Sequence, residues 1–191
     1  LGIDFSGGRN YIVRFAQSVN TEEVNASLNN VFMAAKAELA DEESFSLNVI
    51  TIGADNQVRI STNYLINDNS ENVDETIEAL LYEGCKPFLA EDITLNEFTS
   101  TEINPEVGIM QSQKVGPAVA DDITQSAIWA VLAALLGIFL YVLVRFRNFA
   151  FSVGALVGLA HDALFVLGAY ALLWKVMPFS MEIDQSFIAA I

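Results

Sequence analysis

Apolar and polar residues follow one another in two different ways along the chain. Residues 10–117 alternate between short strand-like runs and stretches with helical spacing, whereas residues 118–191 are dominated by long apolar runs. The first region predicts a water-exposed domain of mixed helices and strands. The second predicts helices that lie in a membrane.

Periods of two and of about 3.6 residues mark the elements of the first region. Residues 20–40 and 71–84 carry apolar side chains at helical spacing behind polar residues suited to helix starts, so we predict two helices. β-branched and aromatic residues predict four strands, at 10–16, 44–53, 56–66 and 107–116. The order β-α-β-β-α-β is typical of a ferredoxin-like α+β domain. ITLNEFTSTE, residues 93–102, is interpreted as either an additional strand or an ordered connection.

Two apolar segments, 118–145 and 149–174, exceed the roughly 20 residues that a membrane-spanning helix needs. The short link RFRN, residues 145–148, predicts an antiparallel hairpin. Two arginines in a short loop favour the cytoplasmic side, which would put residues 1–122 on the outer, periplasmic side. Residues 185–191 predict the start of a further transmembrane helix.

Charge is divided as unevenly as hydropathy. The 191 residues have a net charge of −15 and a mean hydropathy of +0.40. All of the excess charge lies before Ile123, so the acidic surface belongs to the domain and argues against nucleic acid as a partner. The lone Cys85 closes no internal disulfide. The chain starts at Leu1 without a signal peptide, and we interpret it as a fragment of a larger multi-span membrane protein.

Two motifs flank the domain. In GIDFSGG, residues 2–8, the glycines allow a tight turn, and no lysine follows at the spacing of a phosphate-binding loop, so we predict a post-membrane turn within residues 1–9. In VGPAVADDIT, Pro117 suits a first helical turn. Asp121 and Asp122 are interpreted as favourable charges at a helix N-terminus in preference to metal ligands or catalytic groups.

The second apolar segment holds the only histidine, His161, next to Asp162. An aspartate at the centre of a spanning helix costs about 3 kcal/mol, which the dozen Leu, Phe and Val residues of the segment outweigh at about 0.3 to 0.6 kcal/mol each. The pair is either a structural hydrogen bond or a proton-handling site. We favour the second interpretation, because ionisable groups inside membranes usually serve function.

Small residues accompany that pair. Gly154 and Gly158 have the spacing at which another helix can approach closely, and they share a helical stripe with His161. We therefore expect His161 and Asp162 to face protein. The facing surface is predicted on the first segment, at Ala130, Ala133, Ala134 and Gly137.

The motifs together resemble the SecF family, the SecF half of the SecD/SecF preprotein-translocation auxiliary. GIDFSGG resembles the family motif just after its first membrane helix, and residues 115–173 resemble its second and third helices. The acidic stretch Pro87–Glu106 departs from a minimal domain of the family. The matching positions are Gly2, Asp4, Phe5, Gly7, Gly8, Gly116, Pro117, Arg145, Phe146, His161 and Asp162.

The resemblance implies a transport subunit of the plasma (inner) membrane, and not an enzyme. It implies a protein that uses the proton-motive force to promote preprotein translocation, without cofactor or metal. The implied partners are SecD (separate or fused), the SecYEG channel, SecA, exported preproteins and the lipid bilayer. The alternatives are a small-molecule exporter of the resistance-nodulation-division superfamily, an intramembrane enzyme, and a structural anchor with a peptide-binding sheet edge.

Overall fold

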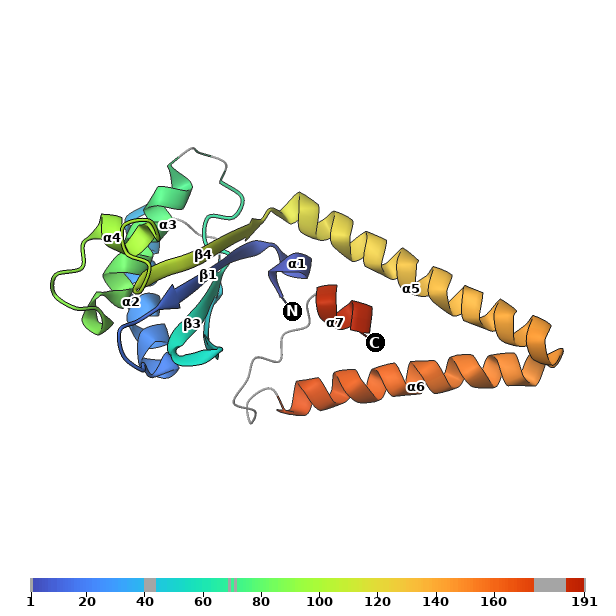
Figure 1. Cartoon of the computed structure of the whole chain (residues 1–191). Helices are drawn as coiled ribbons and strands as arrows, with labels where there is room; N and C mark the ends of the chain where they lie inside the picture. The colour runs from blue at the N-terminus through green and yellow to red at the C-terminus, as the bar shows by residue number, and fades with distance from the viewer. Residues whose placement is uncertain (1, 40–43, 69, 71, 174–184, 191) are drawn as a thin grey trace. The chain divides into compact units, whose positions relative to one another are not determined.

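The computed structural model describes residues 2–39, 44–68, 70, 72–173 and 185–190 and separates into two units (Figure 1). One unit is Ser6–Ala118, and the other combines Leu1–Phe5 with Val119–Ile191. The division follows the change from the acidic, mixed sequence to the apolar sequence. Each unit is described below by itself.

A four-stranded antiparallel sheet forms the centre of the first unit. Its strands are β1 (Gly8–Arg14), β2 (Leu47–Ile52), β3 (Ala54–Thr62) and β4 (Gly108–Val115), in the order β2-β3-β1-β4. All four predicted strands are present. β2 and β3 form a hairpin that turns at Gly53, in the predicted GADN segment.

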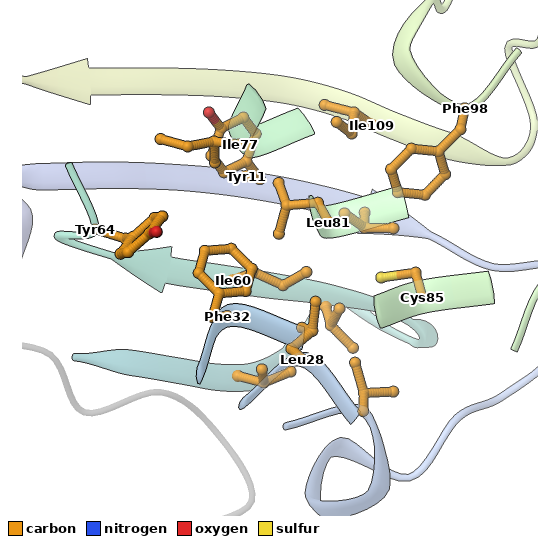
Figure 2. Close-up of a cluster of buried hydrophobic side chains, with 14 of the residues drawn as sticks. Tyr11, Leu28, Phe32, Ile60, Tyr64, Ile77, Leu81, Cys85, Phe98 and Ile109 are labelled. Carbon is orange, nitrogen blue, oxygen red and sulfur yellow. The ribbon is translucent and has the colours of Figure 1, made fainter. Parts of the chain in front are cut away.

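Two amphipathic helices supply the other half of the core. They are α2 (Thr21–Leu39) and α3 (Val73–Cys85), within two residues of the predicted bounds, although Ala40 lies outside the described residues. Figure 2 shows side chains from both helices meeting those of the sheet in one cluster. Its members, all buried, include Tyr11, Val13, Phe15, Leu28, Phe32, Val58, Ile60, Ile77, Leu81 and Cys85.

The stretch Pro87–Glu106 is an ordered part of this unit. It contains the end of a 3₁₀ turn, η1 (Lys86–Phe88), and a short helix, α4 (Leu95–Thr99). The predicted alternative of an additional strand at 93–102 is therefore wrong. A capping box explains the helix, because the Glu97 carboxylate accepts from the Thr94 backbone N–H at 2.8 Å while Thr94 Oγ1 accepts from the Glu97 N–H. Phe98 on this helix is fully buried in the core.

The second unit contains two long apolar helices, α5 (Pro117–Phe146) and α6 (Phe149–Leu173). Both helices are long and apolar enough to cross a membrane. Near the loop between them, the rings of Phe139 and Phe149 lie 5.7 Å apart, as in a hairpin. A short helix, α7 (Gln185–Ala190), follows, while the predicted end points Trp174 and Ile191 lie outside the described residues.

Candidate functional site

The paired glycines of GIDFSGG, Gly7 and Gly8, follow a single helical turn, α1 (Ile3–Ser6), where we predicted only a turn. Gly7 leaves this helix with φ +69°, a left-handed conformation that glycine adopts without strain. A Cβ placed on Gly7 would lie 3.4 Å from Pro117 Cα and 3.5 Å from the Val115 carbonyl oxygen. The two motifs that flank the domain, more than a hundred residues apart in the sequence, therefore touch.

Strand pairing continues this contact into the sheet. Gly8 pairs with Val115, and Arg9 pairs with Lys114, in the antiparallel register of β1 and β4. The chain thus enters and leaves the domain at one end of two neighbouring strands. The motif residues Gly7, Gly8, Gly116 and Pro117 lie together at that end, which their separate positions in the sequence did not indicate.

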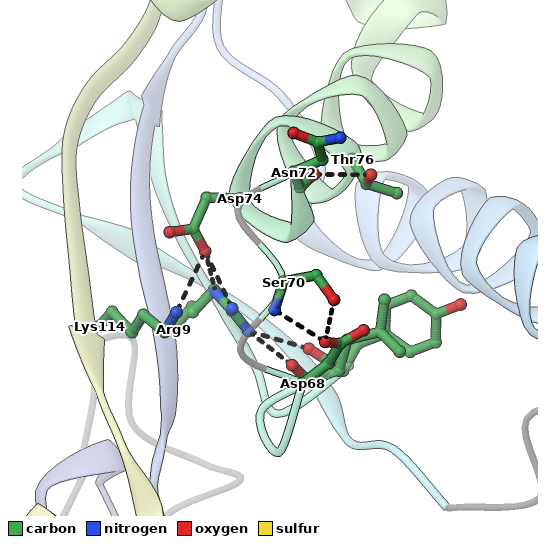
Figure 3. A network of polar contacts seen from close by, with 9 residues as sticks. Arg9, Asp68, Ser70, Asn72, Asp74, Thr76 and Lys114 are labelled. Carbon is green, nitrogen blue, oxygen red and sulfur yellow. Dashed lines mark hydrogen bonds and ion pairs between the residues drawn. The ribbon is translucent and has the colours of Figure 1, made fainter.

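Arg9 is a buried cation next to this turn, and our sequence reasoning missed it. Its side chain is 1% exposed, and both Nε and Nη2 lie 2.9 Å from Oδ1 of Asp74 at the start of α3. Nη1 also donates to the Tyr64 carbonyl oxygen at 3.1 Å. Lys114 reaches the same Asp74 oxygen at 3.5 Å (Figure 3).

The electrostatics of this network keep Asp74 ionised. Partial burial raises the pKa of Asp74, but the hydrogen bond and charge of Arg9, with those of Lys114, outweigh it and lower the pKa below its ordinary value. A neighbouring carboxyl, Glu78, responds in the opposite way, because burial and the charge of Asp74 raise its pKa. The network is therefore a permanent charge cluster at neutral pH.

A signal for Arg9 was present in the sequence. Arg9 has the same parity along β1 as Tyr11 and Val13, whose side chains point into the core. A cation at an inward strand position predicts a nearby carboxylate, because a buried charge is costly without a partner. The partner is 65 residues away, so its identity required the fold.

His161 and Asp162 lie at the middle of α6. His161 Nδ1 is 3.3 Å from Asp162 Oδ1, so the adjacent side chains contact each other. Within the part of the chain that the structure describes, the two side chains are 75% and 81% exposed. The contact fits the structural interpretation as well as the functional one, and the burial of the pair against protein stays a prediction.

The predicted helix-packing residues are also uncovered in the described structure. A Cβ placed on Gly154 or Gly158 would meet no described atom within 4 Å, and the same holds for Gly137 on α5. The described parts of α5 and α6 thus do not pack against each other at these glycines. Their close approach to a helix remains a prediction.

The remaining motif residues lie at the ends of the helices. Phe5 of α1 donates its backbone N–H to the carbonyl oxygen of Gly2, just before the helix, and Asp4 occupies the first turn. Arg145 and Phe146 end α5, with the guanidinium carbon 5.7 Å from the Phe146 ring centre.

The structure gives no metal centre among its described residues. No group of three or more histidine, cysteine, aspartate or glutamate side chains there is arranged to hold a metal ion. Asp121 and Asp122 are exposed in the second turn of α5.

Comparison with known proteins places both motif blocks in one family. Residues 1–19 match the SecD/SecF GG motif, and residues 96–191 match the protein export membrane protein SecD/SecF, C-terminal. The second match covers half of the chain and includes α4, β4 and the two apolar helices.

The relatives that match this chain along its whole length share one name. The chain is 36% identical to the protein translocase subunit SecF of Rhodothermus marinus over 191 residues, which are 51% of that protein. It is 29% identical to SecF of Thermodesulfovibrio yellowstonii and 26% identical to SecF of Haemophilus influenzae, covering 50% and 46% of those proteins. The chain thus spans about half the length of these curated relatives. It belongs to the SecD/SecF family of protein export membrane proteins.

Proposed function

We propose that this chain is part of a SecF-type subunit that uses the proton-motive force to promote preprotein translocation across the plasma membrane. The observation that carries the proposal is the match to SecF subunits of three bacteria along all of the chain. The two apolar helices and the acidic domain suit a subunit with one part in the membrane and one in water. The domain's strand order, β2-β3-β1-β4, supports the ferredoxin-like interpretation of its fold.

The proposed assembly follows from the family. We propose SecD, separate or fused, the SecYEG channel, SecA and exported preproteins as partners. Arg145 and Arg147 at the end of α5 favour a cytoplasmic loop at 145–148, which leaves residues 1–122 on the outer side.

The proposed energy-coupling site is the pair His161 and Asp162. One charge that crosses the full membrane potential releases about 2.3 kcal/mol per 100 mV. A change of protonation on this pair would alter which packing of the surrounding helices is favoured. Gly154 and Gly158, one to two turns away on α6, would let a neighbouring helix come close enough to respond.

The alternative of a small-molecule exporter lacks a comparable observation. All three relatives named above are protein translocase subunits, and none is named as a small-molecule exporter. Depletion of the protein from cells separates the two functions. We expect preproteins to accumulate while sensitivity to toxic small molecules stays unchanged, and the reverse pattern would refute the proposal.

Replacing Asp162 by asparagine tests the coupling site. The substitution keeps the size of the side chain and removes its charge, so we expect loss of the part of export that an uncoupler abolishes in wild-type vesicles. Asp122→Asn is the matched control, because it removes an exposed carboxylate near the start of α5. Full uncoupler-sensitive export by Asp162→Asn would rule out the relay and leave the translocase role to the depletion experiment.

A further inference from the structure

A single carboxylate contacts the two strands through which the chain enters and leaves the domain. Arg9 follows the Gly7–Gly8 turn directly, and Lys114 stands three residues before Pro117, where α5 begins. The two cations are register partners on β1 and β4, and both reach Oδ1 of Asp74. Asp74 itself belongs to α3, a different layer of the domain.

We infer that Asp74 is a positioning residue that clamps the entry and the exit of the domain together and ties both to α3. The clamp is defined as Asp74 with Arg9 and Lys114. It holds the first residues of β1 and the last residues of β4 side by side, so that Gly7 stays against Pro117. The two segments that flank the domain then move as one unit with it.

Because Arg9 is buried, the loss of its ion pair with Asp74 should cost more stability than the loss of an ordinary surface ion pair. The Arg9 side chain is 1% exposed, so its charge is satisfied by what the fold supplies. The described structure supplies the Asp74 carboxylate and the Tyr64 carbonyl oxygen. Without the Asp74 charge, the hydrogen bonds that the guanidinium keeps among the described residues go to the neutral carbonyl oxygens of Tyr64 and Leu65, and the end of β1 would gain from moving toward water.

The backbone hydrogen bonds between β1 and β4 do not by themselves hold the ends of the two strands together as firmly. Backbone hydrogen bonds at the ends of strands open more readily than those in the middle, because nothing beyond them holds the chain. Lys114 is 41% exposed and adds a second, weaker attachment at that end. Asp74 therefore adds a tie from a helix whose Ile77 and Leu81 are fixed in the core.

The consequence for export rests on the proposed function. A displacement of α5 would be passed through Pro117 and the clamp into α3, as well as along β4. The domain would then rotate as one rigid unit, and its last strand, β4, would not separate from the sheet. Asp74 would affect transport through position alone, since the Asp74 carboxylate stays ionised and takes no part in proton transfer.

Spin labels on the two connections test the clamp directly. Nitroxides are attached at Ser6→Cys and Ala118→Cys, both exposed positions, in the intact subunit with its partners in proteoliposomes. Cys85 is fully buried and is replaced by alanine to remove background labelling. The dipolar broadening between the labels is compared in Asp74→Asn, Asp74→Glu and Lys114→Gln. Glu83→Gln is the control, because Glu83 also lies on α3 and its exposed ion pair with Lys86, just after that helix, is remote from Arg9.

We expect Asp74→Asn to lose the broadening and to lower proton-driven export, Asp74→Glu to restore both, and Glu83→Gln to leave both unchanged. Lys114→Gln should lose less of the dipolar broadening and less of the proton-driven export than Asp74→Asn does. Undiminished broadening in Asp74→Asn would overturn the clamp. Lost broadening with normal export would overturn its role in transport. Absence of proton-driven export in the wild type would instead refute the proposed function, while the label measurement would still decide the clamp.

Discussion

Replacing Gly7 by alanine or valine tests whether the two flanking motifs touch as the structure shows. Gly53 is the matched control, because its φ of +75° is close to the +69° of Gly7 but a Cβ there would meet no described atom within 4 Å. Any difference between the two sites therefore measures the contact of residue 7 with Pro117 and Val115, and not backbone strain.

The expected magnitudes follow from these distances. A left-handed backbone costs an alanine about 1–2 kcal/mol, and this cost applies equally to both sites. The Cβ that Gly7→Ala adds would lie 3.4–3.5 Å from its neighbours, which is ordinary contact, so the two alanine variants should lose nearly the same stability. Valine extends beyond Cβ, and at position 7 its methyl groups would overpack against Pro117 at a further cost of about 1–3 kcal/mol. At position 53 they would meet solvent.

Hydrogen exchange of the sheet amides, read by mass spectrometry on the full chain in a membrane mimetic, measures these losses without interference from the apolar helices. We expect equal opening free energies for Gly7→Ala and Gly53→Ala and a lower one for Gly7→Val than for Gly53→Val. Equal values for the two valine variants would show that Gly7 does not lie against Pro117.

Two further predictions concern the core and the charge cluster. Phe98→Ala should lower the free energy of unfolding by about 3–5 kcal/mol, a large part of the about 5–15 kcal/mol that holds a domain folded. Leu95→Ala, on the exposed side of α4, should be nearly neutral in the same exchange measurement. A neutral Phe98→Ala would mean that α4 is not part of the core. Because the pKa of Asp74 is lower in the folded domain than the ordinary 3.8, its charge adds stability above that value, and this stability is lost as the pH falls through the folded-state pKa. Pulse proteolysis with pepsin below about pH 4 should therefore show the folded fraction falling more steeply with decreasing pH in the wild type than in Asp74→Asn. Parallel curves for the two proteins would refute the ion pair as the cause of the lowered Asp74 pKa. The raised pKa of Glu78 acts in the opposite direction in both proteins.

Local periodicity was enough to predict the helices and strands of the domain. α2 and α3 have apolar faces of several turns, and the four strands alternate clearly, so neighbouring residues alone determine these elements. α4 shows where that reasoning fails. The segment ITLNEF, which leads into α4, begins with the alternation of a strand, but the capping box of Thr94 and Glu97 starts a helix, on which Phe98 is buried. A side-chain hydrogen bond decided the outcome, and hydrophobic pattern does not report it.

In the candidate site, too, the local features could be predicted from the sequence and the long-range contacts could not. His161 and Asp162 are sequence neighbours at the middle of α6, so their proximity needs no long-range contact, although adjacent side chains on a helix point about 100° apart. The contact of Gly7 with Pro117 and the pairing of Arg9 with Asp74 join residues that are 110 and 65 positions apart. Such contacts depend on strand order and register, which no short segment of the chain contains.

The two charge clusters differ in what they can respond to, and this difference decides where we propose the proton step. The partial burial of Asp74 is outweighed by two cations that lower its pKa, so its carboxylate is charged at neutral pH. A group that never changes charge cannot extract work from a proton gradient, and it suits a fixed attachment. His161 and Asp162 lie on an apolar helix where each has the other as a polar contact, and histidine is the side chain that ordinarily titrates near neutral pH. A change of charge there would alter the cost of keeping the pair among apolar surroundings. Helix packing around α6 would respond to that cost, and we propose that the clamp of Asp74 with Arg9 and Lys114, next to Gly7 and Pro117, carries the movement into the domain.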